Sequence, residues 1–309
     1  MVIQLRQEVL EQLQQFLPEN RLLQQEPMAR HTTFRVGGPA DLFVELLTED
    51  ELSKTLHILQ TQGEDYYLIG NGSNLLVSDS GYRGVVLHFA KEYNQIQVEG
   101  NRLICQSGAS LAVIARAALE AGLTGFAFAA GIPGSLGGAI VMNAGAYGGE
   151  MKQVVESVRL MDAQGNIIEK TCEEMEFSYR HSILKDTFYV VLSVTLALQP
   201  GNKEEIKQEM DTLAMQRREK QPLEYPSAGS TFKRPEGYFA AKLIQDAGLR
   251  GLSVGDAQVS EKHCGFVINK GNATATDIYQ LMQEIIIRVE QDAQVTLEPE
   301  VILLGEFCK

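Results

Sequence analysis

Three short segments carry side chains that suit acid–base or electrostatic chemistry. The first, FSYRHSILK at residues 177–185, places Arg180 and His181 between apolar stretches. An arginine in such a position is ordinarily a solvated surface residue. It can also direct its guanidinium at the carboxylate or enolate of a ligand. The residue types alone leave both interpretations open.

The second segment, YPSAGSTFKRP at residues 225–235, holds Ser227, Ser230 and Thr231 among small residues. An ordinary turn has this composition. No G-x-S-x-G elbow is present, so the sequence does not support an acyl-transfer serine. A serine in a tight glycine turn can still donate a proton where its hydroxyl is strongly polarised.

The third segment is TLEPEVILL, residues 296–304. Glu298 and Glu300 are two positions apart and are expected on one face of a strand, with Pro299 between them disturbing the geometry. A carboxylate beside this apolar run is either buried, with a partner or a raised pKa, or part of an edge-strand salt bridge.

Two glycine-rich loops are the elements that must position these groups. One is IGNGSNLL at residues 69–76, and the other is GIPGSLGGAIVMNAGAYGG at residues 131–149. Exposed backbone N–H groups in such loops suit a diphosphate. The first loop lacks the third glycine of G-x-G-x-x-G because Leu75 stands there, and the second lacks the lysine of a P-loop. Each alone can be a structural turn, but together they predict a shared phosphate-bearing cofactor.

The bulk composition limits the classes of function. A chain of 309 residues suits two or three domains. The net charge of −13 argues against nucleic-acid binding and against an anionic membrane surface. The five histidines have no metal-ligand spacing. The four scattered cysteines, together with a charged amphipathic N-terminal segment in place of a leader, predict a reduced, cytoplasmic protein.

Local signals place the secondary structure. Thr48 begins a capping box that predicts a helix to about residue 59 with Gly63 after it, and Ser110 is expected to cap a helix that ends at Gly122. Hairpins are expected at residues 96–108 and 154–170. A charged helix follows residue 201, and Thr276 is expected to cap the final helix, to about residue 289. An N-terminal helix with Leu5 on its apolar face is expected to end before Pro18.

Seven motifs together resemble one family. In order they are HTTFRVGGPAD, LIGNGSNLLV, GIPGSLGGAIVMNAGAYGGE, YRHS, R-x-x-K-Q-P, SAGSTFKRP and LEPEV, from about residue 30 to residue 300. The chain is similar to the UDP-N-acetylenolpyruvoylglucosamine reductase family, also called UDP-N-acetylmuramate dehydrogenases. Its glycine loops resemble the flavin-binding part of oxidases of the vanillyl-alcohol oxidase type. The resemblance implies an α+β fold with an FAD-binding unit of that (PCMH) type in two subdomains and a C-terminal α+β substrate domain.

The resemblance also implies the domain limits and the reaction. Residues 1–84 and 85–200 are expected to hold FAD between them, and residues 201–309 to close over the substrate. In the family, NADPH reduces FAD and leaves. UDP-N-acetylglucosamine enolpyruvate then receives hydride from flavin N5 at C3 and a proton at C2, giving UDP-N-acetylmuramate for peptidoglycan. A cytoplasmic monomer without metal, nucleic-acid or membrane partners is expected.

Residue roles follow from the same motifs. Arg180 matches the arginine at the substrate carboxylate, Glu300 a carboxylate that helps to stabilise the enolate, and Ser230 the proton donor. Substrate contacts are implied for Tyr147, Lys220, Lys233 and His263. Cofactor contacts are implied for Ile69, Gly70, Asn71, Gly72, Ser73, Asn74, Leu75, Gly131, Pro133, Gly134, Ser135, Gly137, Gly138, Ala139, Asn143, Gly145 and Arg217.

The chain departs from part of the family. Arg180 and Ser230 are too close in sequence for the tyrosine-bearing insertion that some members place over the substrate, so the chain resembles the short, second type. Without this insertion, the resemblance does not indicate which segment covers the diphosphate of the substrate. Arg234 stands where the family often has asparagine, either as a phosphate contact or facing solvent. A flavin oxidase of the same fold and a binding protein without turnover are the rival hypotheses.

Overall fold

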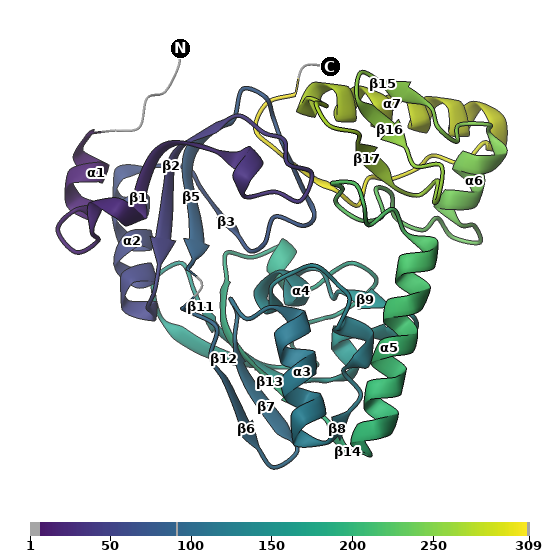
Figure 1. Cartoon of the computed structure of the whole chain (residues 1–309). Coiled ribbons are helices and arrows are strands. Elements are labelled where there is room, and N and C mark those ends of the chain that lie inside the picture. Colours follow the sequence, from purple (N-terminus) through teal and green to yellow (C-terminus); the bar gives the residue numbers. More distant parts are fainter. Residues whose placement is uncertain (1–6, 91, 308–309) are drawn as a thin grey trace.

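The computed structural model describes residues 7–90 and 92–307, and the chain forms three packed units (Figure 1). The first unit contains a four-stranded sheet in the order β1-β2-β5-β3. The pair β1–β2 is antiparallel, whereas β5 is parallel to both β2 and β3. Buried leucines of helices α1 and α2 pack against one face of this sheet. The elements are α1 (Gln7–Leu13), β1 (Leu22–Pro27), β2 (Pro39–Leu46), α2 (Glu49–Gln62), β3 (Tyr66–Ile69), β4 (Leu75–Val77) and β5 (Tyr82–Phe89).

The second unit is a five-stranded antiparallel sheet in the order β12-β11-β13-β7-β6. Helices α3 and α4 share its apolar core. The two expected hairpins are confirmed as β6–β7 and β11–β12. The elements are β6 (Ile96–Glu99), β7 (Arg102–Gln106), α3 (Leu111–Ala121), β8 (Leu123–Thr124), α4 (Leu136–Val141), β9 (Gly145–Ala146), β10 (Gly149–Glu150), β11 (Val155–Met161), β12 (Ile167–Thr171), β13 (Val190–Ala197) and β14 (Gln199–Pro200).

The third unit holds a three-stranded antiparallel sheet and is reached through a long charged helix, α5 (Figure 1). Helix α5 runs beside the second unit and ends at the third. Helices α6 and α7 pack on the small sheet around a core of their own. The elements are α5 (Lys203–Lys220), α6 (Ala240–Asp246), β15 (Ser253–Val254), β16 (Ala257–Val259), β17 (Val267–Asn269), α7 (Ala275–Ala293) and β18 (Ile302–Leu304).

Two contacts connect the third unit to the first. Strand β18 pairs in parallel with β4, directly after the first glycine loop. The carboxylate of Asp79 accepts hydrogen bonds from the backbone N–H groups of Ala275 and Thr276, both at 2.8 Å, at the start of α7. An acidic group at a helix N-terminus is favoured by the unsatisfied N–H groups there. The C-terminal segment is therefore built into the wall of the first unit.

Helix ends follow the local signals in two cases. The Thr48 hydroxyl accepts from the Glu51 N–H and the Ser110 hydroxyl from the Val113 N–H, while Gly63 and Gly122 end the helices at φ of 66° and 69°. Both predictions are confirmed. A residue with positive φ is placed with least strain when it is glycine.

Three local expectations were wrong. The cap of α7 is Thr274, because the hydroxyl of Thr276 donates to Asp79 instead, at 2.6 Å. The stretch 131–149 is not all loop, since α4 forms inside it. The strand expected at Glu298 and Glu300 is confined to β18, and Pro299 makes only an isolated bridge to Phe232. Leu5 lies outside the described residues.

Candidate active site

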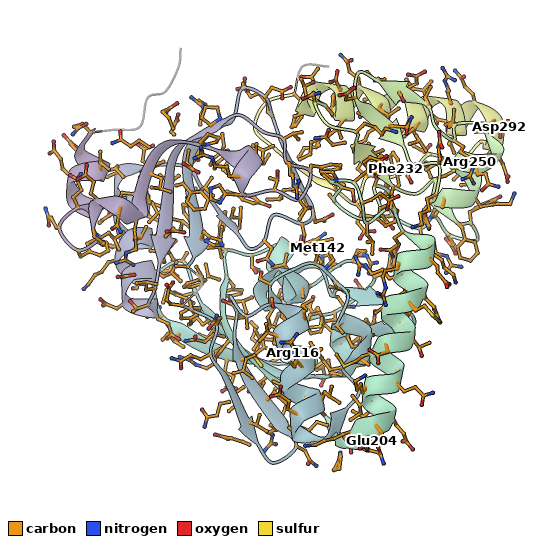
Figure 2. The ribbon with its side chains drawn as sticks, viewed as in Figure 1. Arg116, Met142, Glu204, Phe232, Arg250 and Asp292 are labelled. Carbon is orange, nitrogen blue, oxygen red and sulfur yellow. The ribbon has the colours of Figure 1, made fainter. Side chains whose placement is uncertain are left out.

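A cavity of about 280 Å³ lies where the three units meet. Both glycine loops line it, and so do Arg180, Ser230 and Glu300, which come from different segments. Met142 borders the cavity at the end of α4 (Figure 2). The three residues that the sequence singled out for chemistry are therefore brought together by the fold.

Arg180 and Glu300 form an ion pair, with 2.6 Å between Nε and Oε1, and both side chains are largely buried. Arg180 lies in a tight turn in which Ser178 and His181 exchange two backbone hydrogen bonds. Its φ is 56°, in the left-handed region that L-residues other than glycine seldom occupy. The ring of Tyr179 lies 5.1 Å from the guanidinium carbon. A strained backbone that presents a charged group into a cavity is typical of functional sites.

The backbone of Glu300 is held from two sides. Its carbonyl accepts from the Asn74 amide at 3.0 Å, and its N–H donates to the Thr231 carbonyl at 2.8 Å. Burial raises the pKa of the Glu300 carboxyl, and the nearby charge of Arg180 opposes that shift. The site therefore contains a carboxyl group that takes up a proton more readily than an ordinary glutamate does.

Ser230 lies at the cavity wall on a turn fixed by its neighbours. Gly229 has φ of 76°, and Thr231 is fully buried. The Thr231 hydroxyl accepts from the Val267 N–H at 2.9 Å, and the Thr231 N–H donates to the Gly265 carbonyl at 2.8 Å. The turn holds the hydroxyl of Ser230 at the cavity without using it in a hydrogen bond to any of the described residues.

The glycine loops approach each other and the first unit too closely for side chains. A Cβ on Gly70 would lie 2.1 Å from Oγ of Ser135, and a Cβ on Gly72 would lie 1.9 Å from the carbonyl oxygen of His31. Ser135 caps α4 by accepting from the Gly138 N–H at 3.4 Å. The N-terminus of α4 and the 70–75 loop thus face one space with bare backbone.

Four buried polar atoms around these loops have no hydrogen-bond partner in the described part of the chain. They are Thr33 Oγ1, His88 Nδ1, Ser107 Oγ and Gln221 Oε1. Each lines one of three adjoining cavities. Burial lowers the pKa of His88 to about 4, so its imidazole is neutral at pH 7. Buried polar atoms are nearly always paired, so these four indicate where a polar ligand binds.

Sequence reasoning missed these four residues. Gln221 and Thr33 belong to the motifs R-x-x-K-Q-P and HTTFRVGGPAD, but the motifs alone predict no role for either residue. His88 had no local signal at all. It reaches the site because β5 places it beside Ile69 at the end of β3.

Most of the expected cofactor residues line the three cavities. Arg217 and the loop residues 69–75, 133–135, 138, 139 and 145 border the central cavity. Gly131 lines the largest cavity, and Gly137 lines a small one of about 90 Å³ next to Ser107 and His88. Asn143 lines none of them. It is fully buried, and its amide bonds to Glu150, to the Ser178 carbonyl and to the Lys152 N–H. Its polar atoms brace the turn that carries Arg180, and the contact of Asn143 with the cofactor stays a prediction.

The expected substrate residues lie away from these cavities. Tyr147, Lys220, Lys233 and His263 line none of the three. Lys233 pairs with Glu298 at 2.9 Å. The ring of His263 packs edge-on against Phe266, and its Nδ1 accepts from the Gly265 N–H. Arg234 stacks on Phe239 with 4.0 Å between the guanidinium carbon and the ring centroid. The structure places none of these side chains beside Arg180 and Glu300.

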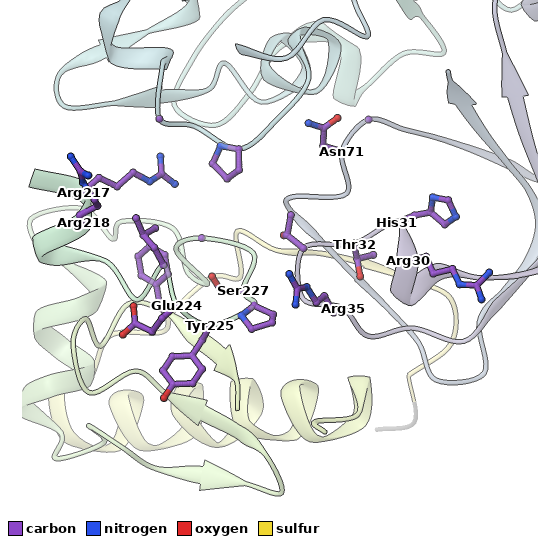
Figure 3. A pocket seen from close by; sticks show the side chains of 18 of the residues that line it. Arg30, His31, Thr32, Arg35, Asn71, Arg217, Arg218, Glu224, Tyr225 and Ser227 are labelled. Carbon is purple, nitrogen blue, oxygen red and sulfur yellow. The ribbon is translucent and has the colours of Figure 1, made fainter. Parts of the chain in front are cut away.

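The largest cavity, of about 960 Å³, adjoins the central one (Figure 3). Arg217 and Arg218 enter it from the end of α5, and Arg30 and Arg35 lie on the loop between β1 and β2. Among the described residues, no group of acidic, histidine or cysteine side chains could hold a metal ion. Over the same residues, no helix is both long and apolar enough to cross a membrane.

Comparisons with known proteins identify the domains and the relatives of this chain. Residues 39–171 match the model of an FAD binding domain, and residues 221–304 match the model of the UDP-N-acetylenolpyruvoylglucosamine reductase C-terminal domain. The chain is 54% identical to UDP-N-acetylenolpyruvoylglucosamine reductase of Clostridioides difficile over 91% of this chain and 92% of that protein. It is 52% identical to the enzyme of the same name from Caldanaerobacter subterraneus over 96% of this chain and 98% of that one.

A solved structure supports the fold in three dimensions. The crystal structure of UDP-N-acetylenolpyruvylglucosamine reductase (MurB) from Thermus caldophilus superimposes with a TM-score of 0.81 at 35% identity. The superposition covers 92% of this chain and 99% of the Thermus caldophilus chain. The expected FAD-binding fold with a C-terminal α+β domain is confirmed. The chain therefore belongs to the UDP-N-acetylenolpyruvoylglucosamine reductase family.

Proposed function

We propose that this protein is an NADPH-dependent flavoenzyme, UDP-N-acetylmuramate dehydrogenase, that reduces the enolpyruvyl group of UDP-N-acetylglucosamine enolpyruvate in peptidoglycan biosynthesis. The observation that carries this proposal is the buried Arg180–Glu300 ion pair in the same cavity as Ser230 and both glycine loops. A cation, a carboxyl group and a hydroxyl at one wall suit the stabilisation and protonation of an enolate.

The residues present fit FAD. Bare backbone from the 70–75 loop and the N-terminus of α4 face a common space that a Cβ would fill, as a pyrophosphate site requires. Partnerless polar atoms of His88 and Ser107 lie in the small cavity beside it. We propose that the glycine loops hold the pyrophosphate and that these two side chains meet polar groups of the adenosine. When bound, FAD supplies the hydride chemistry that no amino-acid side chain provides.

Arg180 is proposed to bind the substrate carboxylate and to stabilise charge as it develops there. Reduction of the enolpyruvyl double bond at C3 leaves negative charge at C2, next to that carboxylate. A preorganised guanidinium stabilises such charge without reorganisation during the reaction. Glu300, with its raised pKa, is proposed to share a proton with the developing enolate while it also fixes the guanidinium of Arg180.

Ser230 is proposed to donate the proton to C2. Its hydroxyl lies at the cavity and forms no hydrogen bond to the described residues, so it is available to the substrate. A serine hydroxyl is a weak acid, and this step requires an enolate that is basic enough to accept its proton. Lys220 is proposed to approach as part of a proton relay or as a phosphate contact, once the third unit closes over a bound substrate. Tyr147, Lys233 and His263 are proposed to contact substrate in that same closed form.

We also propose three domains, at residues 1–84, 85–200 and 201–309, and a cytoplasmic monomer. FAD is proposed to lie between the first two domains. The five-stranded sheet and the three-stranded sheet each fall within one domain, whereas the limit at residue 84 lies inside β5 (Tyr82–Phe89) of the first sheet. Strand β18 also crosses the division, because it pairs with β4 of the first domain.

Anaerobic flavin spectroscopy tests the proposal. The purified protein is expected to be yellow, to be bleached by NADPH and to regain its colour on addition of UDP-N-acetylglucosamine enolpyruvate, with UDP-N-acetylmuramate as product. Reoxidation by oxygen as fast as by the substrate would favour a flavin oxidase. A protein that cannot be reconstituted with FAD would exclude the proposal.

A further inference from the structure

The largest cavity has a charge that contrasts with that of the whole chain. Four arginines line it, namely Arg30, Arg35, Arg217 and Arg218, against a single acidic residue, Glu224. The chain as a whole carries a net charge of −13. Since a locally positive cavity concentrates anions against a negative overall field, this arrangement favours an anionic ligand.

Arg35 is held in an unfavourable backbone conformation. Its φ is 58°, between the buried residues Phe34 and Val36. The turn is fixed by a hydrogen bond from the Arg35 N–H to the Thr32 carbonyl and by one from the Thr32 hydroxyl to the Val36 carbonyl. Glycine would fit this position with less strain. An exposed arginine that lines a cavity from such a position is a candidate for ligand binding.

Arg35 and Arg217 lack counter-charges in the described structure. No carboxylate of residues 7–90 or 92–307 pairs with either guanidinium, and burial lowers the pKa of Arg217. The hydroxyl of Thr33, next to Arg35, is buried without a partner at the same cavity. In Figure 3, Arg217 and Arg218 lie on one side of the cavity and Thr32 on the other, with Arg35 between them. The guanidinium groups of Arg35 and Arg217 and the hydroxyl of Thr33 are thus donors around one space that have no partner among the described residues.

The arginine-lined cavity is continuous with the central one. Gly70, Asn71, Pro133, Arg217, Gly229 and Phe266 line both. The small cavity of about 90 Å³ adjoins both of them. No acidic or basic side chain borders it except His88, whose imidazole is neutral at pH 7. The arginine-lined cavity therefore suits the phosphate groups of a nucleotide better than the small cavity does.

We propose that the arginine-lined cavity binds the adenosine end of the dinucleotide co-substrate and that Arg35 contacts its 2′-phosphate. This inference rests on the proposed function, in which NADPH places its nicotinamide in the central cavity. Arginine is the side chain that dinucleotide-binding proteins place near a 2′-phosphate, and its planar fork matches phosphate oxygens. The site thereby selects NADPH over NADH, through a group that takes no part in hydride transfer.

Calorimetric titration of the oxidised, FAD-loaded protein with adenosine 2′,5′-bisphosphate tests this site directly. The wild type is expected to bind this probe at least tenfold more tightly than adenosine 5′-monophosphate. Arg35→Gln and Arg35→Gly are each expected to weaken binding of the bisphosphate by about tenfold, equivalent to about 1.4 kcal/mol. Arg35→Gly also relieves the positive-φ strain, so it excludes misfolding as the cause. Arg116→Gln, on the exposed face of α3 (Figure 2), is the matched control.

Stopped-flow measurement of flavin reduction, together with the FAD content, shows whether the cavity binds a phosphate of NADPH or a phosphate of the resident FAD. If the cavity serves the co-substrate, the Arg35 variants keep the wild-type FAD content, and their KM rises more for NADPH than for NADH. Loss of FAD in these variants would assign the cavity to the resident cofactor and overturn the inference. An unchanged NADPH-to-NADH preference, with normal bleaching and normal product, would overturn the inference and leave the proposed function intact. If neither NADPH nor NADH bleached the flavin of the wild-type protein, the proposed function itself would be excluded.

Discussion

Glu300 Oε1 accepts a hydrogen bond from Arg180 Nε at 2.6 Å, although 120 residues separate the two in sequence. Arg180 comes from a turn of the second unit, and Glu300 from the segment that leads into β18. The same glutamate is held by Asn74 of the glycine loop. Glu300 thus contacts the second unit through its carboxylate and the glycine loop of the first unit through its backbone carbonyl. Changes at either end of the Arg180–Glu300 pair are the sharpest tests of the proposed function.

Glu300→Gln is expected to lower the rate of substrate reduction by on the order of 10²–10⁴ and to spare reduction of the flavin by NADPH. The amide preserves the volume of the side chain, but it can neither carry negative charge beside Arg180 nor take up and release a proton. Stopped-flow measurement of the two half-reactions separates these effects. Glu298→Gln is the matched control on the same segment, since Glu298 is exposed and pairs with Lys233. Equal losses in the two variants would contradict the role of Glu300.

Arg180→Gly and Arg180→Ala are expected to lose activity alike but to differ in stability. Both remove the guanidinium and leave Glu300 unpaired. Only glycine relieves the backbone strain at φ of 56°, so the glycine variant is expected to be about 1 kcal/mol more stable than the alanine variant. Urea unfolding measures the difference. Equal unfolding midpoints would show that this turn stores no strain.

Ser230→Ala is expected to leave flavin reduction by NADPH intact and to slow formation of UDP-N-acetylmuramate by on the order of 10²–10⁴. The methyl group occupies the same turn but has no proton to donate. Single-turnover product analysis provides the measurement. Ser227→Ala, in the same loop but lining the other cavity, is the control. Wild-type turnover in Ser230→Ala would remove the serine from the mechanism.

Gly72→Ala is expected to destabilise the protein by more than Gly63→Ala and to lower its FAD content. Both glycines have positive φ, 57° and 66°, so both variants carry similar backbone strain. A Cβ on Gly72 would also meet the His31 carbonyl at 1.9 Å, whereas nothing lies within 4 Å of a Cβ on Gly63. The visible absorbance per protein and the urea midpoint give the two readouts. Similar behaviour of the two variants would mean that the loop can move away from His31 at little cost.

His88 is expected to make the folded state less stable in mild acid. Burial lowers its pKa from 6.5 to about 4. Between these two pH values the His88 imidazole stays neutral in the folded chain but gains a proton in the unfolded chain. Stability is therefore lost as pH falls from 6.5 towards 4, by about 2 kcal/mol at pH 5. Urea midpoints at pH 7.5 and 5, with saturating FAD, are expected to differ less in His88→Gln than in the wild type. His57→Gln, at an exposed position, provides the comparison.

The local elements could be predicted because their causes are local. Thr48 and Ser110 cap helices through hydrogen bonds to residues three positions on, and Gly63 and Gly122 supply the left-handed ends. Such contacts join residues that are close in sequence, so a short motif is enough to predict them. Thr276 shows where this fails: its hydroxyl binds Asp79, which is 197 residues away, and the cap moves to Thr274.

The site could be predicted only in part, for the same reason. The motif order identified Arg180, Ser230 and Glu300, and the fold brings these three to one cavity. It did not reveal that the Asn143 amide bonds inside the protein, or that β5 places His88 beside the first glycine loop. Burial and pairing at those positions depend on which strands become neighbours, and no short motif encodes that.

The pairing of β18 with β4 has a consequence for how the protein is made. Asn74 leaves the ribosome 226 residues before Glu300, the residue whose carbonyl it holds. The first unit can form its sheet early, since domains generally fold in order during synthesis, but the edge next to its glycine loop waits for β18. A nascent chain that already has both glycine loops therefore still lacks a completed site, and capture of the flavin is expected to wait until β18 has left the ribosome and paired with β4.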